Sequence, residues 1–146
     1  MDISLVASLS LLGAAIVAGI VYKTLHGRGR KVRKQELIDL AKLRATQNGV
    51  PVTQLGKLAT LVQFTTEYCG QCPGVRRTLS QLAFRHGGLE FCEVDITDRL
   101  DVAAHFNISQ TPTVFLLDSS GKLVYRVGGI PRLNLLTEEL EKLGVK

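Results

Sequence analysis

Two cysteines, Cys69 and Cys72, have the side chains and the spacing that dithiol chemistry requires. Thiols three positions apart at the start of a helix can reach each other, so they can form and release a disulfide. A helix N-terminus also places unpaired backbone N–H groups and partial positive charge beside the first sulfur, which stabilises its thiolate. An apolar run precedes the motif at 61–64 and an amphipathic stretch follows it at 75–86. This order of strand, Cys-x-x-Cys motif and helix predicts thiol–disulfide redox chemistry.

Structural zinc binding is the alternative use of these thiols. Cys69, Cys72, His86 and Cys92 together offer four ligands of acceptable type. Cys92, however, falls in the middle of an expected strand, where a buried and unreactive cysteine is the favoured interpretation. We therefore expect no metal, and no cofactor beyond the Cys69–Cys72 disulfide itself.

The hydrophobic pattern predicts the elements that position the motif. Strands are expected over 60–65, 89–96, 113–117 and 123–127, and a helix over 73–86. A short helix capped by Thr97 or Asp98 should end at Phe106, and Pro131 should open a final helix. Upstream, residues 35–47 have helical spacing and stop at Asn48-Gly49. The order β-α-β-α-β-β-α predicts an α/β domain.

The N-terminal segment differs in composition from the rest of the chain. Residues 3–22 carry no charge, and twenty helical residues span roughly 30 Å, the thickness of a bilayer core. This predicts a transmembrane helix. A cleaved signal peptide is the alternative, but its usual positive charge before the apolar run is missing.

The net charge of +5 belongs to one short segment. Residues 23–34 carry six basic side chains, whereas residues 35–146 carry twelve basic and twelve acidic ones. A domain without basic excess argues against nucleic acid as a partner. Basic residues after a membrane span stay on the cytoplasmic side, so we expect a single-pass protein of the cell membrane with its domain in the cytoplasm.

These observations divide the chain into four parts. We expect a transmembrane anchor over 1–22, a basic juxtamembrane linker over 23–34, a connecting helix over 35–50 and the α/β domain over 51–146.

Four separate features give the domain a family resemblance. They are Leu61-Val62-Gln63-Phe64 leading to Cys69-Gly70-Gln71-Cys72, the strand end Val94-Asp95-Ile96, the segment Thr111-Pro112-Thr113, and Val127-Gly128 before the last helix. Over 51–146 the chain resembles the thioredoxin family, and most of all the membrane-anchored thioredoxin-like proteins of actinobacteria. The resemblance implies a thioredoxin fold, with a central mixed sheet and helices on both faces.

The resemblance also implies roles for individual residues. Cys69 would attack the partner and form a mixed disulfide, which Cys72 would resolve. Pro112 would be cis and face the sulfurs, and the backbone of Thr111 would pair with the substrate chain. Tyr68 would cover the dithiol, although a plain core aromatic is almost equally expected. The remaining substrate-binding positions would be Gly70, Gln71 and Gly128.

Some residues depart from the family pattern. Gln63 occupies the place of a buried aspartate that takes up a proton from the resolving thiol, and an amide cannot act as that base. Glu93 occupies the place of a lysine and either serves as the proton relay instead or is a solvated or edge glutamate. Gln71 replaces a proline inside the motif, where residues tune the reduction potential.

The sequence thus predicts a membrane-tethered thiol–disulfide oxidoreductase. Its partners would be protein disulfides or thiols, the membrane, and a thiol reductant or a thioredoxin reductase-like donor. The alternative is a thioredoxin-fold binding module, or a thiol carrier dedicated to one membrane partner.

Overall fold

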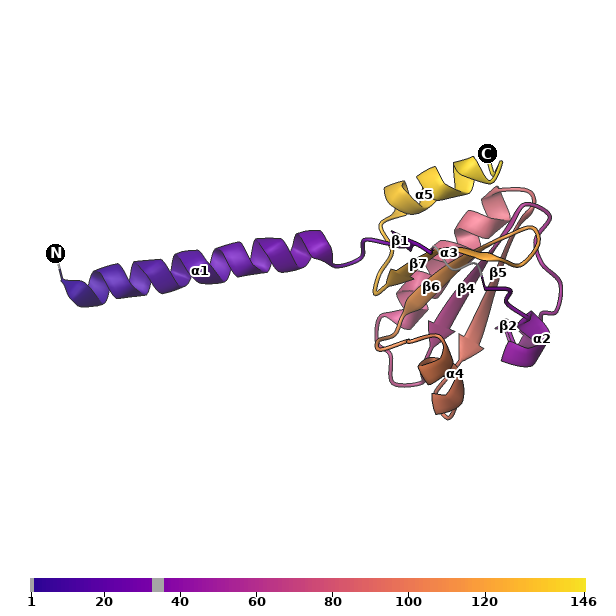
Figure 1. Cartoon of the computed structure of the whole chain (residues 1–146), viewed down its shortest axis with the longest axis horizontal. Helices are drawn as coiled ribbons and strands as arrows, with labels where there is room; N and C mark the ends of the chain where they lie inside the picture. The colour runs from indigo at the N-terminus through magenta and orange to yellow at the C-terminus, as the bar shows by residue number, and fades with distance from the viewer. Residues whose placement is uncertain (1, 33–35) are drawn as a thin grey trace.

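The computed structural model describes residues 2–32 and 36–146, and its sheet carries helices on both faces (Figure 1). Within these residues, seven strands form one sheet in the order β1-β7-β6-β4-β5-β2-β3. The strands are β1 (Arg30–Lys31), β2 (Thr46–Gln47), β3 (Val50–Pro51), β4 (Ala59–Thr65), β5 (Leu89–Asp95), β6 (Thr113–Asp118) and β7 (Leu123–Gly128). The helices are α1 (Ile3–Leu25), α2 (Leu40–Leu43), α3 (Cys72–Arg85), α4 (Leu100–His105) and α5 (Leu133–Lys142).

Strand β4 is the centre of the sheet and leads directly to the cysteine motif. It runs parallel to β5 and antiparallel to β6, so the sheet is mixed, as predicted. All seven residues of β4 are buried, which explains why its sequence is a continuous apolar run rather than an alternating one. The two elements after it, α3 and β5, confirm the predicted helix and strand to within a residue or two.

Alternate side chains of the central strands fill two separate cores. Leu61 packs with α3 and α5 on one face, whereas Phe64 packs with Phe106 and Phe115 on the face covered by α2 and α4. Burying one such side chain contributes roughly 1.5–3 kcal/mol. The two faces matter for function because Gln63 lies on the α3 face and Cys92 on the other.

The predicted helix over 35–47 is wrong, apart from residue 35, which lies outside the described residues. Only Leu40–Leu43 are helical; Asp39 caps them by accepting from the backbone N–H of Ala41 at 3.0 Å, and Arg44 ends them in a left-handed conformation. Thr46 then pairs with Glu93 of β5. Pairing with the open edge of β5 makes Thr46–Gln47 a strand, and Ile38, Leu40, Leu43 and Ala45 pack into the core, so the segment does not form a separate connecting helix.

The predicted linker over 23–34 is shorter than expected. Its residues 33 and 34 lie outside the described residues. Arg30 and Lys31 add an antiparallel edge strand to β7, so only residues 26–29 separate α1 from the sheet. A Cβ on Gly29 would overlap the ring of Tyr125, which explains a glycine at this close approach. Arg132 donates to the backbone carbonyls of Lys23 at 2.7 Å and Thr24 at 3.2 Å, in the last turn of α1.

Two helix starts also differ from expectation. Thr97 does not cap α4, because its hydroxyl donates to Asp95 at 2.6 Å, and Asp98 does not cap it either, because Arg99 holds the cap position. Helix α5 begins at Leu133, two residues after Pro131.

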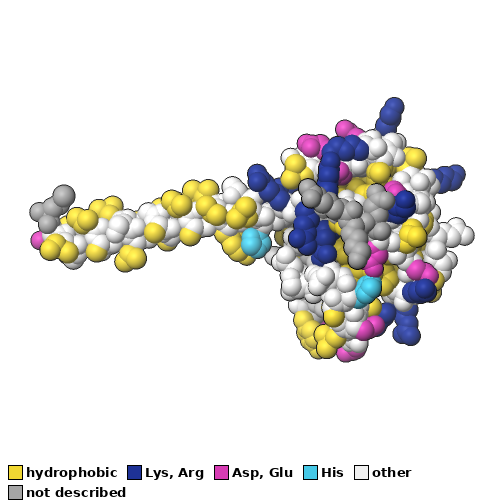
Figure 2. Space-filling model, in the orientation of Figure 1, with side chains coloured by type: hydrophobic (Ala, Val, Ile, Leu, Met, Phe, Trp, Pro, Cys, Tyr) yellow, Lys and Arg dark blue, Asp and Glu magenta, His cyan; other side chains and the backbone are white. Residues whose placement is uncertain are grey.

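Helix α1 has the length and composition of a membrane span. It has 23 residues, a mean hydropathy of 2.3 over its most apolar window, and no residue buried against the rest of the protein. Figure 2 shows hydrophobic side chains along its whole length. An N-terminal signal sequence can meet the same criteria of length and hydropathy.

Candidate redox site at the start of helix α3

The two cysteines of the motif form a disulfide at the N-terminus of α3, with their Cα atoms 5.4 Å apart. Cys72 is the first residue of α3 and is only 1% exposed, whereas Cys69 is partly exposed. This asymmetry means that a partner can reach one sulfur of the pair and not the other.

The start of α3 favours a thiolate on Cys69 once the disulfide is reduced. The first turn of the helix contains no acidic residue, so nothing there offsets the positive end of the helix dipole. Pro73 lies in this first turn, where its missing N–H is not needed for helical hydrogen bonding.

The loop before β6 lies next to the segment that leads to Cys69. The Thr111–Pro112 peptide bond is cis, as the resemblance implied. The Thr111 and Thr66 hydroxyls are 3.2 Å apart, and the carbonyl of Pro112 accepts from the backbone N–H of Gly129 at 2.7 Å. Within the described residues, no hydrogen bond uses the backbone N–H or C=O of Thr111. These groups are therefore available to an extended partner chain.

Gln63 lies directly beneath the buried cysteine. It is fully buried, and its Nε2 donates to the backbone carbonyl of Cys72 at 3.0 Å. Its Oε1 has no hydrogen-bond partner among the described residues. The side chain therefore holds the first turn of α3 against β4, at the cost of one unpaired buried acceptor.

Glu93 is the neighbour of Gln63 in the register of β4 and β5. Its side chain is 11% exposed, and its Oε1 pairs with Nε of Arg76 at 2.6 Å. The solvated interpretation of Glu93 is therefore wrong. Arg76 lies one helical turn after Cys72, so the ion pair places a carboxylate on the same face of the sheet as the buried thiol.

Arg76→Ala should destabilise the fold by about 1–2 kcal/mol, because it leaves the Glu93 carboxylate buried without its partner. We expect a smaller loss of stability than for a fully buried ion pair, because the Arg76 side chain is 44% exposed and solvent screens its charge. Urea unfolding would measure the difference. Arg77→Ala is the matched control, since Arg77 is exposed and forms no ion pair within the described residues; equal losses in both variants would contradict the prediction.

A groove of about 350 Å³ opens beside the motif and contains two of the predicted substrate-binding residues. Gly70, Gln71 and Val75 line one side, and Ile130 and Pro131 line the other. Tyr68 is 85% exposed, which excludes the core-aromatic alternative. Sequence reasoning missed Ile130 and Pro131, and the apolar Ile-Pro pair after Gly128-Gly129 was the only signal for them.

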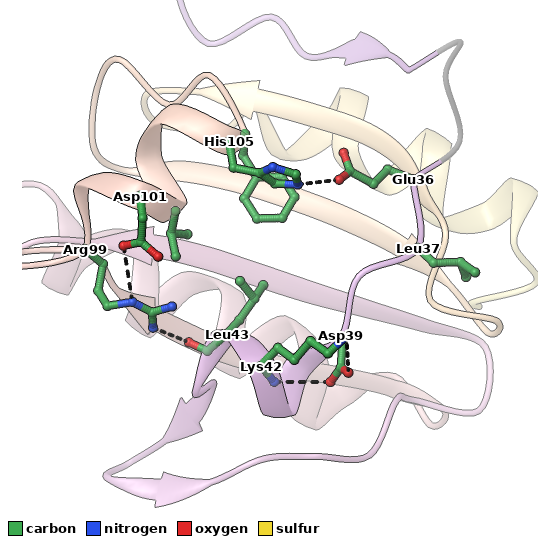
Figure 3. Close-up of a pocket in the computed structure, with 10 residues that line it drawn as sticks. Glu36, Leu37, Asp39, Lys42, Leu43, Arg99, Asp101 and His105 are labelled. Atoms are coloured by element: carbon green, nitrogen blue, oxygen red, sulfur yellow. Dashed lines mark hydrogen bonds and ion pairs between the residues drawn. The ribbon is translucent and has the colours of Figure 1, made fainter.

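Gly128 does not belong to this groove. It lines a different cavity, where an added Cβ would come within 2.5 Å of the Gln110 side chain. A third cavity of about 500 Å³, between α2 and α4, contains none of the predicted redox residues (Figure 3). There His105 Nε2 lies 2.7 Å from Glu36 Oε1, and Arg99 pairs with Asp101 at 3.7 Å.

The four proposed zinc ligands do not converge. Cys92 lies on the face of the sheet opposite α3, in the core with Val94 and Ile96. His86 follows the far end of α3, where its Nδ1 is 2.6 Å from the carbonyl of Lys146. Burial, aided by Glu90 and Glu93, raises the pKa of the Cys92 thiol to about 12. Cys92 is thus the buried, unreactive cysteine that the sequence favoured.

Iodoacetamide should modify Cys92 at pH 8 only after unfolding, since the buried thiol stays protonated. Unreduced protein makes the measurement specific, because Cys92 is then the free cysteine. The folded pKa lies above the ordinary value of 9.0, so this thiol's contribution to stability is complete below pH 9 and is lost as the pH rises towards 12. Mass spectrometry would follow the modification. Rapid modification of Cys92 in the folded protein would contradict its burial.

Comparison with known proteins identifies the family. The sequence model of the Thioredoxin family matches residues 40–142, which include α2 and every element of the redox site. The chain belongs to the thioredoxin family. The match begins before residue 51, in agreement with the earlier start of the domain seen in the sheet.

Individual relatives support this assignment. The chain is 31% identical over 74 residues to thioredoxin of Gallus gallus, covering 51% of this chain and 70% of that protein. It is 39% identical over 75 residues to the TPR repeat-containing thioredoxin TDX of Arabidopsis thaliana, covering 51% of this chain but 20% of that protein. The thioredoxin structure of Fasciola hepatica superposes with a TM-score of 0.50 at 25% identity, covering 60% of this chain and 82% of the other. The predicted thioredoxin fold is confirmed, whereas the narrower likeness to actinobacterial proteins stays a prediction.

Proposed function

We propose that this thioredoxin-family protein is a membrane-tethered thiol–disulfide oxidoreductase that works through Cys69 and Cys72. The observation that carries the proposal is the exposure of Cys69 beside a buried Cys72 at the N-terminus of α3. One thiol can meet a partner, and the other is held within reach of the first.

In the reducing direction, the Cys69 thiolate attacks one sulfur of a substrate disulfide. A mixed disulfide forms between Cys69 and the attacked sulfur, and the other substrate sulfur leaves as a thiolate that takes up a proton. Cys72 then loses its proton and attacks Cys69, which closes the Cys69–Cys72 disulfide and releases the second substrate thiol. Two electrons pass from the dithiol to the substrate, and a thiol reductant or a thioredoxin reductase-like donor must return them.

The neighbouring residues have distinct roles in this proposal. The free backbone of Thr111 pairs with the substrate chain, next to cis-Pro112, and Tyr68, Gly70 and Gln71 contact its side chains. Glu93, rather than Gln63, takes up the Cys72 proton, because a carboxylate can accept a proton and an amide cannot.

The substrates are protein disulfides or thiols close to a membrane. Helix α1 acts as a single-pass anchor, and the basic residues that follow it favour a cytoplasmic domain. A reporter enzyme fused after Lys146 tests the orientation, since activity outside the cytoplasmic membrane would overturn the cytoplasmic assignment.

Insulin reduction tests the catalytic proposal. The full chain in micelles of a neutral detergent, supplied with dithiothreitol, should precipitate the insulin B chain faster than dithiothreitol alone. A chain whose Cys69–Cys72 disulfide is reduced by dithiothreitol but which leaves insulin untouched would instead be a carrier dedicated to one membrane partner. The short link between α1 and the sheet favours this second candidate, because it restricts which partners the site can reach.

A further inference from the structure

A cavity of about 190 Å³ beside the cis-proline loop is lined by Arg28, Arg30 and Arg126. It lies on the face of the sheet away from α3, and Gln110 and Thr113 form its polar wall. The cavity contains neither cysteine of the redox motif, so its charge has no part in the exchange chemistry.

The arginines of this cavity repel one another. Arg30 and Arg126 are directly opposite in the β1–β7 register, an arrangement that destabilises a sheet when the charges are alike. Within residues 2–32 and 36–146, no ion pair joins any of the three arginines to a carboxylate, and residues 1 and 33–35 contain no acidic side chain. Burial and Arg30 together lower the pKa of Arg126. A bound anion would relieve this repulsion.

Arg126 is fixed in place rather than free in solvent. Its guanidinium donates to the carbonyls of Phe106 at 2.9 Å and Asn107 at 3.2 Å, and it lies over the Phe115 ring at 5.1 Å. A guanidinium held in this way keeps its charge at the cavity without losing further side-chain entropy when a ligand arrives.

The cavity lies where a membrane surface would be. Arg28 is three residues after the end of α1 at Leu25, and Figure 2 shows Lys and Arg side chains gathered where α1 meets the domain. Arg132 fixes this junction through its hydrogen bonds to the last turn of α1. The headgroup phosphates of a bilayer would therefore lie next to the three arginines.

We propose that this cavity binds the phosphate of an anionic phospholipid headgroup, an inference that rests on the proposed membrane-spanning role of α1. Arginine guanidinium groups suit phosphate oxygens because their N–H donors match the geometry of the anion. The wall of the cavity is also the base of the substrate-binding loop, since Thr113 Oγ1 donates to the Gln110 carbonyl at 2.7 Å. A bound headgroup would thus hold the cis-proline loop at a fixed orientation to the bilayer.

Native mass spectrometry of the full chain can test the site. The protein would be released from neutral detergent micelles containing equal amounts of phosphatidylglycerol and phosphatidylcholine, and the retained lipids counted. The parent should retain phosphatidylglycerol preferentially. The double variant Arg28→Gln/Arg30→Gln should lose that preference by on the order of tenfold or more.

The control removes the same charge from the same segment. Lys23→Gln/Lys31→Gln should behave as the parent, because Lys31 is opposite Tyr125 on the other face of β1 and Lys23 lies in α1. Equal losses in both double variants would show diffuse attraction and overturn the site. Both pairs are exposed, and replacing Arg30 also removes its repulsion of Arg126, so neither double variant should melt at a lower temperature than the parent.

A second arm separates lipid from free phosphate. Inorganic phosphate, titrated into lipid-free micelles and followed by NMR of the arginine Nε–H groups, should bind far more weakly than the lipid; equally tight phosphate binding without lipid preference would overturn the lipid assignment. If the parent chain showed no preference for phosphatidylglycerol while its insulin reduction was intact, this inference alone would be overturned. Conversely, failure of insulin reduction would leave the lipid measurement unaffected.

Discussion

Replacing Cys69 with serine should abolish disulfide exchange, whereas replacing Cys72 should yield a protein that captures its substrate and does not release it. The difference follows from exposure, since Cys69 is partly exposed and Cys72 is 1% exposed. Without the attacking thiol, insulin reduction should fall at least about 100-fold, to the rate of dithiothreitol alone. Without the resolving thiol, the first step still occurs but the mixed disulfide persists.

Non-reducing electrophoresis and intact-mass measurement would distinguish the two variants. Only Cys72→Ser should carry a covalently attached peptide after incubation with a disulfide substrate. Cys92→Ala is the matched control, because it removes the buried thiol on the opposite face and should leave exchange unchanged. If Cys69→Ser remained as active as the parent, the assignment of the attacking thiol would be wrong.

Gln63→Glu should make the stability of the protein strongly dependent on pH. The new side chain has the same shape, but a carboxylate there would be buried and would face the Cys72 carbonyl instead of donating to it. Both effects raise the folded pKa of the introduced carboxyl above its unfolded value of about 4.3. The variant should match the parent below that value and lose about 3–5 kcal/mol as the pH rises towards 9, since buried glutamates reach pKa values of roughly 8–9.

Urea unfolding at a series of pH values would measure this loss. Gln63→Leu is the control, because it removes the unpaired Oε1 together with the amide and should change stability by less than about 1.5 kcal/mol at every pH. Gln63→Glu should also introduce a new ionisation in the rate of the resolving step, because a carboxylate can take up the Cys72 proton. A flat stability profile would show that Gln63 has more access to water than its burial indicates.

The sequence was informative wherever local pattern and tertiary environment agreed. Strand β4, helix α3 and strand β5 lie within one or two residues of their expected bounds, since their apolar residues follow the period of each element. The cysteine motif could be placed from the same pattern, because it falls between a buried strand and an amphipathic helix.

The edges of the sheet could not be predicted in this way. Strands β1, β2 and β3 have two residues each, too few for any alternation to appear, and each forms because a neighbouring edge offers partners. The helical spacing of 35–47 was genuine, but pairing between Thr46 and Glu93 prevailed over it.

Contacts between site residues that are far apart in the sequence could not be predicted either. Arg76 and Glu93 meet only because α3 packs over β5, so their ion pair has no signature in the linear sequence. The substrate-binding role that the resemblance implies for Gly128 stays a prediction, and its contact with Gln110 has no motif that would have indicated it.

If α1 spans a membrane as proposed, the short connection between α1 and β1 limits how far the domain can move from the lipid surface. Five Cα–Cα steps from Leu25 to Arg30 cover at most about 18 Å, and Arg132 holds the junction closer still. With α1 in a bilayer, a domain of this size could reach no further than about 5 nm from the lipid surface. A substrate would then be selected by the height of its disulfide above the lipid rather than by its sequence, and within that layer its effective concentration would be far higher than in free solution.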